Sequence, residues 1–177
     1  VLAPIATQGA VPTAAQATQC FGGTGVVGTD TTIAAVATPT VTQRISRLTG
    51  NITGTITMTA GDDMVAQNSE TLILFTENSF VGGSGVLKLT LNGSNSLLRA
   101  SSEAWVSSAA GSDVLTKEAN TDFTDGHNTI VITDDGNNST ILAGSFIYLH
   151  TGAADNSVAC KAVIRTSGGV VTIESAS

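Results

Sequence analysis

Residues 157–175 read SVACKAVIRTSGGVVTIES, and this stretch decides the fold class. Every second residue from Val158 to Ile164 is apolar or a cysteine, which is the period of a strand that buries one face. A turn signal, Gly168-Gly169, separates this run from a second run with the same period. The stretch therefore predicts a C-terminal hairpin, in which Ile164 pairs with Ile173 and Thr166 pairs with Val171.

The hairpin also predicts which side chains are buried. We expect its core face to hold Val158, Cys160, Ala162, Ile164, Val171 and Ile173. Lys161 and Arg165 are expected to point to solvent or to a neighbouring subunit. A type I′ turn needs positive φ at both central positions, which Gly168 and Gly169 would supply without strain.

The same periodicity indicates about six more strands upstream of this hairpin. Alternating apolar residues predict a half-buried strand over 49–59, with Ile52, Ile56 and Met58 inward, and another over 86–91. A fully apolar strand is expected over 69–76. Further strands are expected around Trp105, over 128–133, and over 140–150 with a bulge at Gly144.

Turn-forming residues separate these strands. Gly82-Gly83-Ser84-Gly85 predicts a flexible connection, and DDGNNS at 134–139 predicts a turn. Asn92-Gly93 is a strong hairpin signal that would place Leu98 opposite Leu89. Residues 112–119 fit one or two turns of helix.

Short strands with turns between them are typical of an all-β domain. We expect an antiparallel β-sandwich or jelly-roll-like barrel over residues 44–177, preceded by an extended N-terminal arm over residues 1–43. The arm has one charged residue, Asp30, and neither the periodicity of a helix or strand nor the high charge of a disordered tail. A segment of this kind is best explained as an arm that lies on another surface.

The composition limits the partners. Charged residues are 12% of the chain, against about 25% in typical domains. A surface with so little charge suits coverage by neighbouring subunits. The net charge is −7 and the seven basic residues are scattered, so we expect no direct contact with nucleic acid. No apolar run is long enough for a membrane span, so we expect no membrane partner.

The two cysteines, Cys20 and Cys160, lie far apart in the sequence and do not form a disulfide framework. Cys160 falls on the predicted core face of its strand. A buried free thiol is therefore the leading interpretation, with a Cys20–Cys160 bridge as the alternative.

Few residues could carry catalysis. Gly23–Gly28 (GTGVVG) fits G-x-G-x-x-G, but a Thr-rich segment with Pro39 follows it and the expected acidic residue is missing. The only histidines are His127 and His150, and a zinc site would need both of them and both cysteines. His127 has Ser and Asp residues nearby in the sequence, but no G-x-S-x-G motif accompanies it. We interpret His127 as a loop residue and His150 as a strand end.

Acidic residues gather in predicted loops, at Asp62-Asp63, at Asp122 with Asp125, and at Asp134-Asp135. The Asp134-Asp135 loop could offer oxygen ligands to Ca²⁺, although ordinary turn propensity also explains it. A glycosidase-type carboxylate pair stays open, but one Trp and one Tyr are poor material for a sugar site. We expect no catalytic, cofactor-binding or metal-binding residue.

The neutral arm 1–43, the Thr-rich NITGTITMT strand at 51–59 and the VACKAVIRTSGGVVTIES stretch at 158–175 resemble those of bacteriophage virion structural proteins. The residue composition and pattern of the whole chain are most similar to those of capsid decoration (cement) proteins. The resemblance implies a non-enzymatic homotrimer in the virion, which binds a major capsid protein or other virion proteins and uses its N-terminal arm to grip the shell.

Two other classes stay open. One is a secreted bacterial β-rich surface protein, such as a pilus, surface-layer or adhesin domain, which would be extracellular. The other is a carbohydrate-active domain. A leader sequence would separate the secreted class from the virion class, and a cleft lined with paired carboxylates would favour the third.

Overall fold

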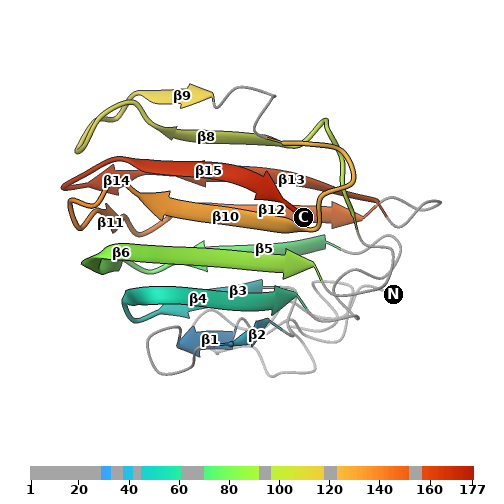
Figure 1. Cartoon of the computed structure of the whole chain (residues 1–177), viewed down its shortest axis with the longest axis horizontal. Coiled ribbons are helices and arrows are strands. Elements are labelled where there is room, and N and C mark those ends of the chain that lie inside the picture. Colours follow the sequence, from blue (N-terminus) through green and yellow to red (C-terminus); the bar gives the residue numbers. More distant parts are fainter. Residues whose placement is uncertain are drawn as a thin grey trace, which may run out of the picture.

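The computed structural model describes residues 29–32, 38–41, 45–60, 70–91, 97–117, 123–151 and 157–177. Every regular element in this part of the chain is a strand, so the predicted all-β class is confirmed (Figure 1). The strands are β1 (Thr29–Thr32), β2 (Thr40–Val41), β3 (Ile45–Thr49), β4 (Ile52–Ala60), β5 (Glu70–Phe75), β6 (Asn78–Leu91), β7 (Leu97–Leu98), β8 (Glu103–Ser107), β9 (Leu115–Lys117), β10 (Thr129–Asp134), β11 (Thr140–Ile141), β12 (Phe146–Thr151), β13 (Ser157–Ile164), β14 (Thr166–Ser167) and β15 (Val171–Ala176).

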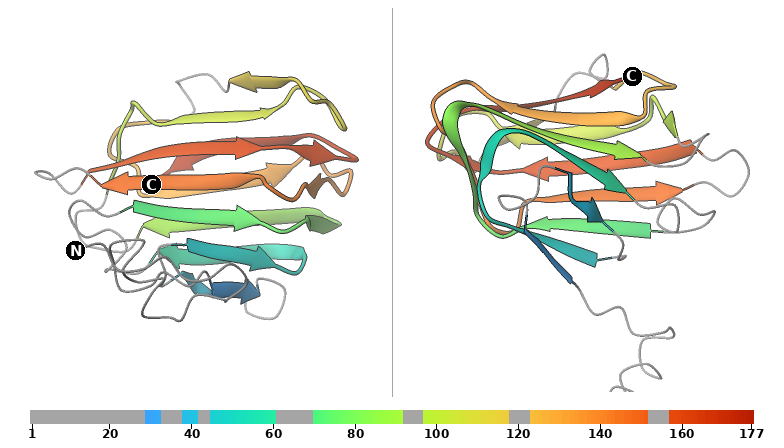
Figure 2. Two further views of the ribbon diagram at one scale, coloured as in Figure 1. Left: turned by 180° about the vertical axis from the view of Figure 1, so that it is seen from behind. Right: turned by 60° about the horizontal axis from the view of Figure 1, so that its bottom comes forward.

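These strands form two sheets that pack face to face. Sheet A has the order β1-β3-β5-β12-β13-β8-β9, with β7 added beside β13. Sheet B has the order β14-β11-β6-β10-β15, with β4 beside β6 and β2 beside β4. Strands β4, β6, β10 and β15 of sheet B lie in front of β3, β5, β12 and β13 of sheet A in Figure 1, and Figure 2 shows the two layers from other sides. The predicted sandwich is confirmed.

The first half of the fold is a stack of arches. The chain alternates between the sheets, so that β1, β3 and β5 are parallel neighbours in sheet A while β2, β4 and β6 are parallel neighbours in sheet B. The second half adds antiparallel pairs, with β10 between β6 and β15 and β12 between β5 and β13. The pairing is thus mixed, whereas the sequence had suggested antiparallel pairs throughout. Strands β1 and β2 fall within the stretch assigned to the arm, of which residues 1–28, 33–37 and 42–43 lie outside the described residues.

The core is built mostly from aliphatic side chains, as the composition indicated, and Phe75, Phe80 and Phe123 also belong to it. Each sheet contributes alternate residues, and those of the two sheets meet in one cluster. Ile52, Ile56 and Met58 of β4 are buried, as are Leu87, Leu89 and Leu91 of β6, so both predicted inward faces are confirmed.

The C-terminal stretch is buried as predicted but is not a hairpin. All six residues predicted for its core face are buried, and both Lys161 and Arg165 are exposed. However, β13 belongs to sheet A and β15 to sheet B, and Ile173 pairs with Ile132 rather than with Ile164. The period of a strand determines which face is buried, but it does not determine the neighbouring strand.

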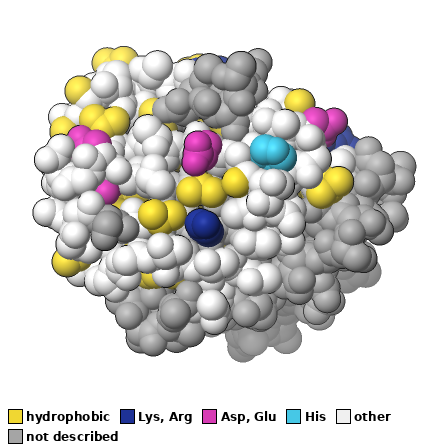
Figure 3. Space-filling view, in the orientation of Figure 1, with side chains coloured by type: hydrophobic (Ala, Val, Ile, Leu, Met, Phe, Trp, Pro, Cys, Tyr) yellow, Lys and Arg dark blue, Asp and Glu magenta, His cyan; other side chains and the backbone are white. Residues whose placement is uncertain are grey.

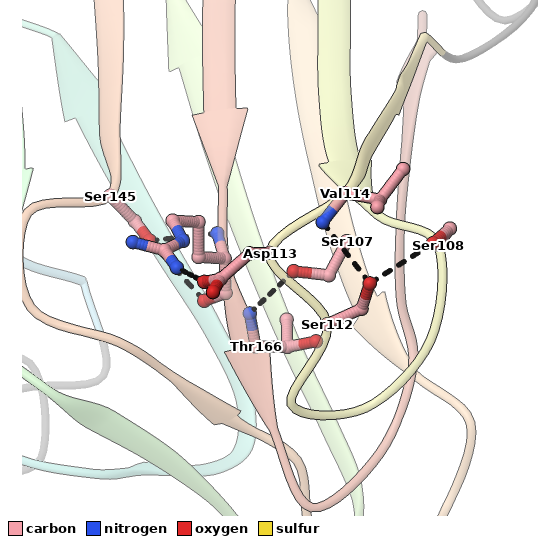
Figure 4. Close-up of polar contacts among 8 residues, drawn as sticks. Ser107, Ser108, Ser112, Asp113, Val114, Ser145 and Thr166 are labelled. Carbon is pink, nitrogen blue, oxygen red and sulfur yellow. Dashed lines mark hydrogen bonds and ion pairs between the residues drawn. The ribbon is translucent and has the colours of Figure 1, made fainter.

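Two buried serines hydrogen-bond to the backbone where the chain leaves sheet A. Ser145 Oγ accepts the backbone N–H of Arg165 at 2.9 Å, and Ser107 Oγ accepts that of Thr166 at 3.1 Å (Figure 4). An ion pair between Arg165 and Asp113 adds a contact to the loop between β8 and β9. These bonds hold the segment in which the chain crosses from β13 of sheet A to β14 of sheet B, where the sequence had predicted a hairpin.

The hairpin predicted at Asn92-Gly93 is also wrong. Leu98 lies in β7, which pairs in parallel with β13 of sheet A, whereas Leu89 lies in β6 of sheet B. The backbone N–H of Leu98 donates to the carbonyl oxygen of His127 at 2.6 Å. The turn itself lies outside the described residues.

Three local predictions need correction. Residues 82–85 are a bulge within the continuous strand β6, because Thr53 pairs with Val81 and Thr55 with Val86. Residues 140–150 divide into β11 and β12, with a turn at Gly144. The segment 112–119 contains β9 rather than helix. The strand predicted over 69–76 is confirmed as β5, whose residues are alternately buried. The predicted strands around Trp105 and over 128–133 are confirmed as β8 and β10, and 134–139 is a turn.

Candidate functional site

The aromatic residues are divided sharply between the core and one face. Six of the seven lie in the described part of the chain, and Phe75, Phe80 and Phe123 are buried. The other three, Trp105, Phe146 and Tyr148, are half-buried on the outer face of sheet A. This set includes the single Trp and the single Tyr of the chain. The exposed aromatic surface of the described residues is therefore concentrated on one sheet.

Strand register places these residues in line. Phe146 of β12 pairs with Leu74 of β5 and with Val163 of β13, and Val163 pairs with Trp105 of β8. The line continues to Arg47 of β3 at one end and to Lys117 of β9 at the other. We call this set the aromatic row: Arg47, Leu74, Phe146, Val163, Trp105 and Lys117.

A second line of side chains runs beside the aromatic row. It crosses the same strands two residues further along each of them and consists of Ile45, Leu72, Tyr148, Lys161 and Glu103. Ile45, Leu72 and Tyr148 are half-buried, so on β3, β5 and β12 the apolar surface extends over both lines of side chains. Charged groups complete the line at its β8 end.

A hydrogen bond to an ion-paired carboxylate holds the edge of the Trp105 indole that carries Nε1. The indole Nε1–H donates to Glu103 Oε2 at 3.3 Å. Lys117 Nζ lies 3.1 Å from Glu103 Oε2, and Lys161 Nζ lies 3.9 Å from Glu103 Oε1. The hydrogen bond from Lys117 is the main cause that lowers the pKa of Glu103 below its usual value, so this carboxylate stays ionised in mildly acidic solution.

Tyr148 is fixed in a different way. Partial burial, together with the neighbouring carboxylate of Glu70, raises the pKa of the Tyr148 phenol above its usual value. A hydrogen bond between this hydroxyl and Glu70 is among the causes of the raised pKa. Glu70 and His150 pair on adjacent strands at this border of the face, and His150 is exposed.

The outer face of sheet B has a different chemistry. Its central residues are mostly threonines, and hydroxyl pairs cross between strands at Thr90–Thr129, 3.3 Å, and Thr133–Thr172, 2.7 Å. Figure 3 shows this side of the molecule, where acidic, basic and apolar side chains are scattered among polar ones. The aromatic row thus has no counterpart among the central residues of sheet B.

The two histidines are not brought together. His127 precedes β10 of sheet B, and its Nδ1 lies 3.2 Å from Ser175 Oγ. The same Ser175 oxygen accepts the backbone N–H of Thr124 at 2.8 Å, so the contact ties this loop to β15. His150 lies in β12 of sheet A. The interpretation of His127 as a loop residue and of His150 as a residue near a strand end agrees with their positions.

Cys160 is a buried free thiol. Burial raises the pKa of this thiol to about 12, so it is protonated and unreactive at neutral pH. Cys20 lies outside the described residues, and the free state of Cys160 agrees with the leading interpretation rather than with the alternative of a Cys20–Cys160 bridge. The Gly23–Gly28 motif, Asp62-Asp63 and Asp122 lie outside them as well.

The carboxylates of the 134–139 turn are used within the turn. Asp134 accepts the backbone N–H groups of Gly136 at 3.1 Å and Ser139 at 3.2 Å. Asp135 accepts the backbone N–H of Asn137 at 3.1 Å and its side-chain amide at 2.9 Å, which lowers the pKa of Asp135. These are the bonds of Asx turns, and they account for the acidic residues in this turn. No group of three His, Cys, Asp or Glu residues that could hold a metal ion occurs in the described ranges.

Sequence reasoning missed the aromatic row. From the sequence, one Trp and one Tyr are poor material for a sugar site, and their positions relative to one another are set only by the fold. A local signal was present at Phe146 and Tyr148, which alternate with the apolar Ile147 and Leu149 in a strand with two apolar faces. Trp105 joins them only through the pairing of β13 with β8.

No helix in the described part of the chain is long and apolar enough to cross a membrane. Comparisons with protein-family models, with curated proteins and with solved structures found no significant match to this chain.

Proposed function

We propose that this protein is a non-enzymatic structural subunit of a virion, of the capsid decoration type. It forms homotrimers, and it binds the shell through subunit contacts and its N-terminal arm. The resemblance of the sequence to decoration proteins supports the choice of a capsid as the assembly.

The observation that carries the proposal is the position of the first strands. β1 ends the strand order of sheet A, and β2 pairs only with β4 in sheet B. β1 and β2, the described strands within the stretch assigned to the arm, therefore lie beside β3 and β4 at one end of each sheet. Edge strands are the places where another chain adds by β-augmentation, and a neutral arm beside them suits contacts with neighbouring subunits.

The polar contacts of the sandwich support a structural role. Ser107, Ser145 and Ser175 accept backbone N–H groups, and the carboxylates of the 134–139 turn do the same. The side chains that might have been considered for chemistry therefore contribute to a rigid scaffold.

Particle association tests this proposal. The full chain and a variant that lacks residues 1–28 would be mixed with shells purified from the source and sedimented. We expect the full chain to sediment with shells and to be trimeric in analytical ultracentrifugation, whereas the truncated chain stays in the supernatant. A monomer that binds no shell would contradict the proposal, and release into the medium with a cleaved leader would favour the secreted class.

A further inference from the structure

The aromatic row contains two aromatic rings that lie two strand spacings apart. Phe146 and Trp105 lie on β12 and β8, with only β13 between them. Neighbouring strands are about 4.8 Å apart, so these two positions are separated by roughly 9.6 Å across the sheet. Val163 lies between them on the same face and provides an apolar floor.

We propose that the aromatic row binds a β-1,4-linked polysaccharide chain. In such a chain every second sugar presents the same ring face, and this repeat is close to two strand spacings. The C–H groups of a pyranose ring can pack against an aromatic face, so Phe146 and Trp105 would each contact one sugar of the repeat. The chain would run across the strands, along the row.

The groups around the row suit sugar hydroxyls. Glu103, Lys117 and Lys161 form an ion-paired cluster beside Trp105, with Lys161 side chain 53% and Lys117 side chain 41% exposed. The Tyr148 hydroxyl, which is hydrogen-bonded to Glu70, lies in the second line. Donors and acceptors along one side of the apolar strip and at its β9 end provide hydrogen bonds to hydroxyl groups that project from the edge of a sugar ring.

The dimensions favour a chain over a protein partner. Two lines of residues across five strands cover roughly 350 Å², from the usual strand spacing and residue repeat. A stable protein interface buries about 800 Å² on each partner. An extended oligosaccharide needs only a narrow strip, and the row is long and narrow.

This inference goes beyond the structural role proposed above and does not depend on shell binding. It concerns the outer face of sheet A, whereas the shell contact was assigned to the arm and to subunit contacts. A protein that fails to bind shells could still bind the polysaccharide, and the reverse also holds.

Trp105 fluorescence gives a direct test, because it is the only tryptophan of the chain. The full chain would be titrated with cellohexaose and chitohexaose, which are β-1,4-linked, and with maltohexaose, which is α-1,4-linked. We expect a saturable change in emission with at least one β-linked sugar and none with maltohexaose. The comparison of cellohexaose with chitohexaose shows which of the two β-linked chains is preferred.

Substitutions in the aromatic row test whether the sugar binds there. In isothermal titration calorimetry, Trp105→Ala and Phe146→Ala should each weaken binding about tenfold. Val86→Ala is the matched control, since Val86 is a half-buried apolar residue on the outer face of sheet B and should leave binding unchanged. Thermal unfolding would verify that each variant is folded.

Three outcomes would overturn the proposal. These are no response to either β-linked hexasaccharide at millimolar concentration, an equal response to maltohexaose, or unchanged binding in both aromatic variants. A change in sedimentation of Trp105→Ala without any sugar binding would instead identify the row as a contact between subunits.

Discussion

At the scale of single residues, Ile164 shows how burial sets the effect of a substitution. Its side chain is fully buried between the sheets, whereas Val163 next to it is half-buried on the outer face. We expect Ile164→Ala to lower the free energy of unfolding by about 2–5 kcal/mol, because it removes buried methyl groups and leaves a cavity. Val163→Ala should cost clearly less. Denaturant unfolding of both variants measures the difference, and equal losses would contradict the burial described here.

Cys160 gives a prediction about pH. Its thiol has a pKa raised from 9.0 to about 12 by burial, so the folded state keeps its proton where the unfolded state loses it. The contribution of this group to stability is full below pH 9 and falls as the pH rises toward 12. Stability of the parent chain should therefore decline more steeply above pH 9 than that of Cys160→Ala. Cys20→Ala in both backgrounds is the control, and parallel pH profiles would refute the prediction.

At the scale of elements, the connection between β14 and β15 depends on two glycines for different reasons. Gly168 has φ of 88°, a conformation that strains other residues. Gly169 has no such angle, but a Cβ there would lie 2.1 Å from Ser139 Oγ. The type I′ turn predicted from the sequence needs positive φ at both positions, and this turn type is wrong because only Gly168 has a positive φ; at Gly169 the space around the residue is what favours glycine.

Single variants separate these two causes. Gly168→Ala should lose about 1 kcal/mol through backbone strain, and Gly169→Ala about 1–3 kcal/mol through overpacking. Replacing Ser139 by Gly in the same chain should recover part of the loss of Gly169→Ala, and none of the loss of Gly168→Ala. Thermal unfolding of the four chains tests this, and equal recovery in both would show that the connection is held differently.

At the scale of the whole molecule, β1 and β2 cover the β3 and β4 sides of the two sheets. We expect deletion of residues 1–28 to lower the unfolding midpoint less than a longer deletion that reaches the first described strands, which begin at Thr29. Deletion of residues 1–41 also removes β1, β2 and the fully buried Val41. It should lower the midpoint and increase light scattering, because strand edges become available for aggregation. Identical behaviour of the two truncated chains would contradict this.

The sequence by itself determined the all-β class and most of the inward and outward faces. Alternation in 157–164 and 86–91 is enough, because successive side chains of a strand point to opposite sides whatever lies beside it. The acidic turn at 134–139 was also readable, since its hydrogen bonds are local. These features depend on residues within a few positions of one another.

Only the tertiary structure decided which strands are neighbours. β13 and β15 were expected to pair, but they lie in opposite sheets, and hydrogen bonds to Ser107 and Ser145 hold the segment where the chain crosses between them. The aromatic row has the same origin, as Trp105 and Phe146 are 41 positions apart in the sequence and meet through β13. The backbone edge of an apolar strand can hydrogen-bond to many other strands with similar local energy. The choice of neighbouring strand therefore depends on the packing of the whole chain.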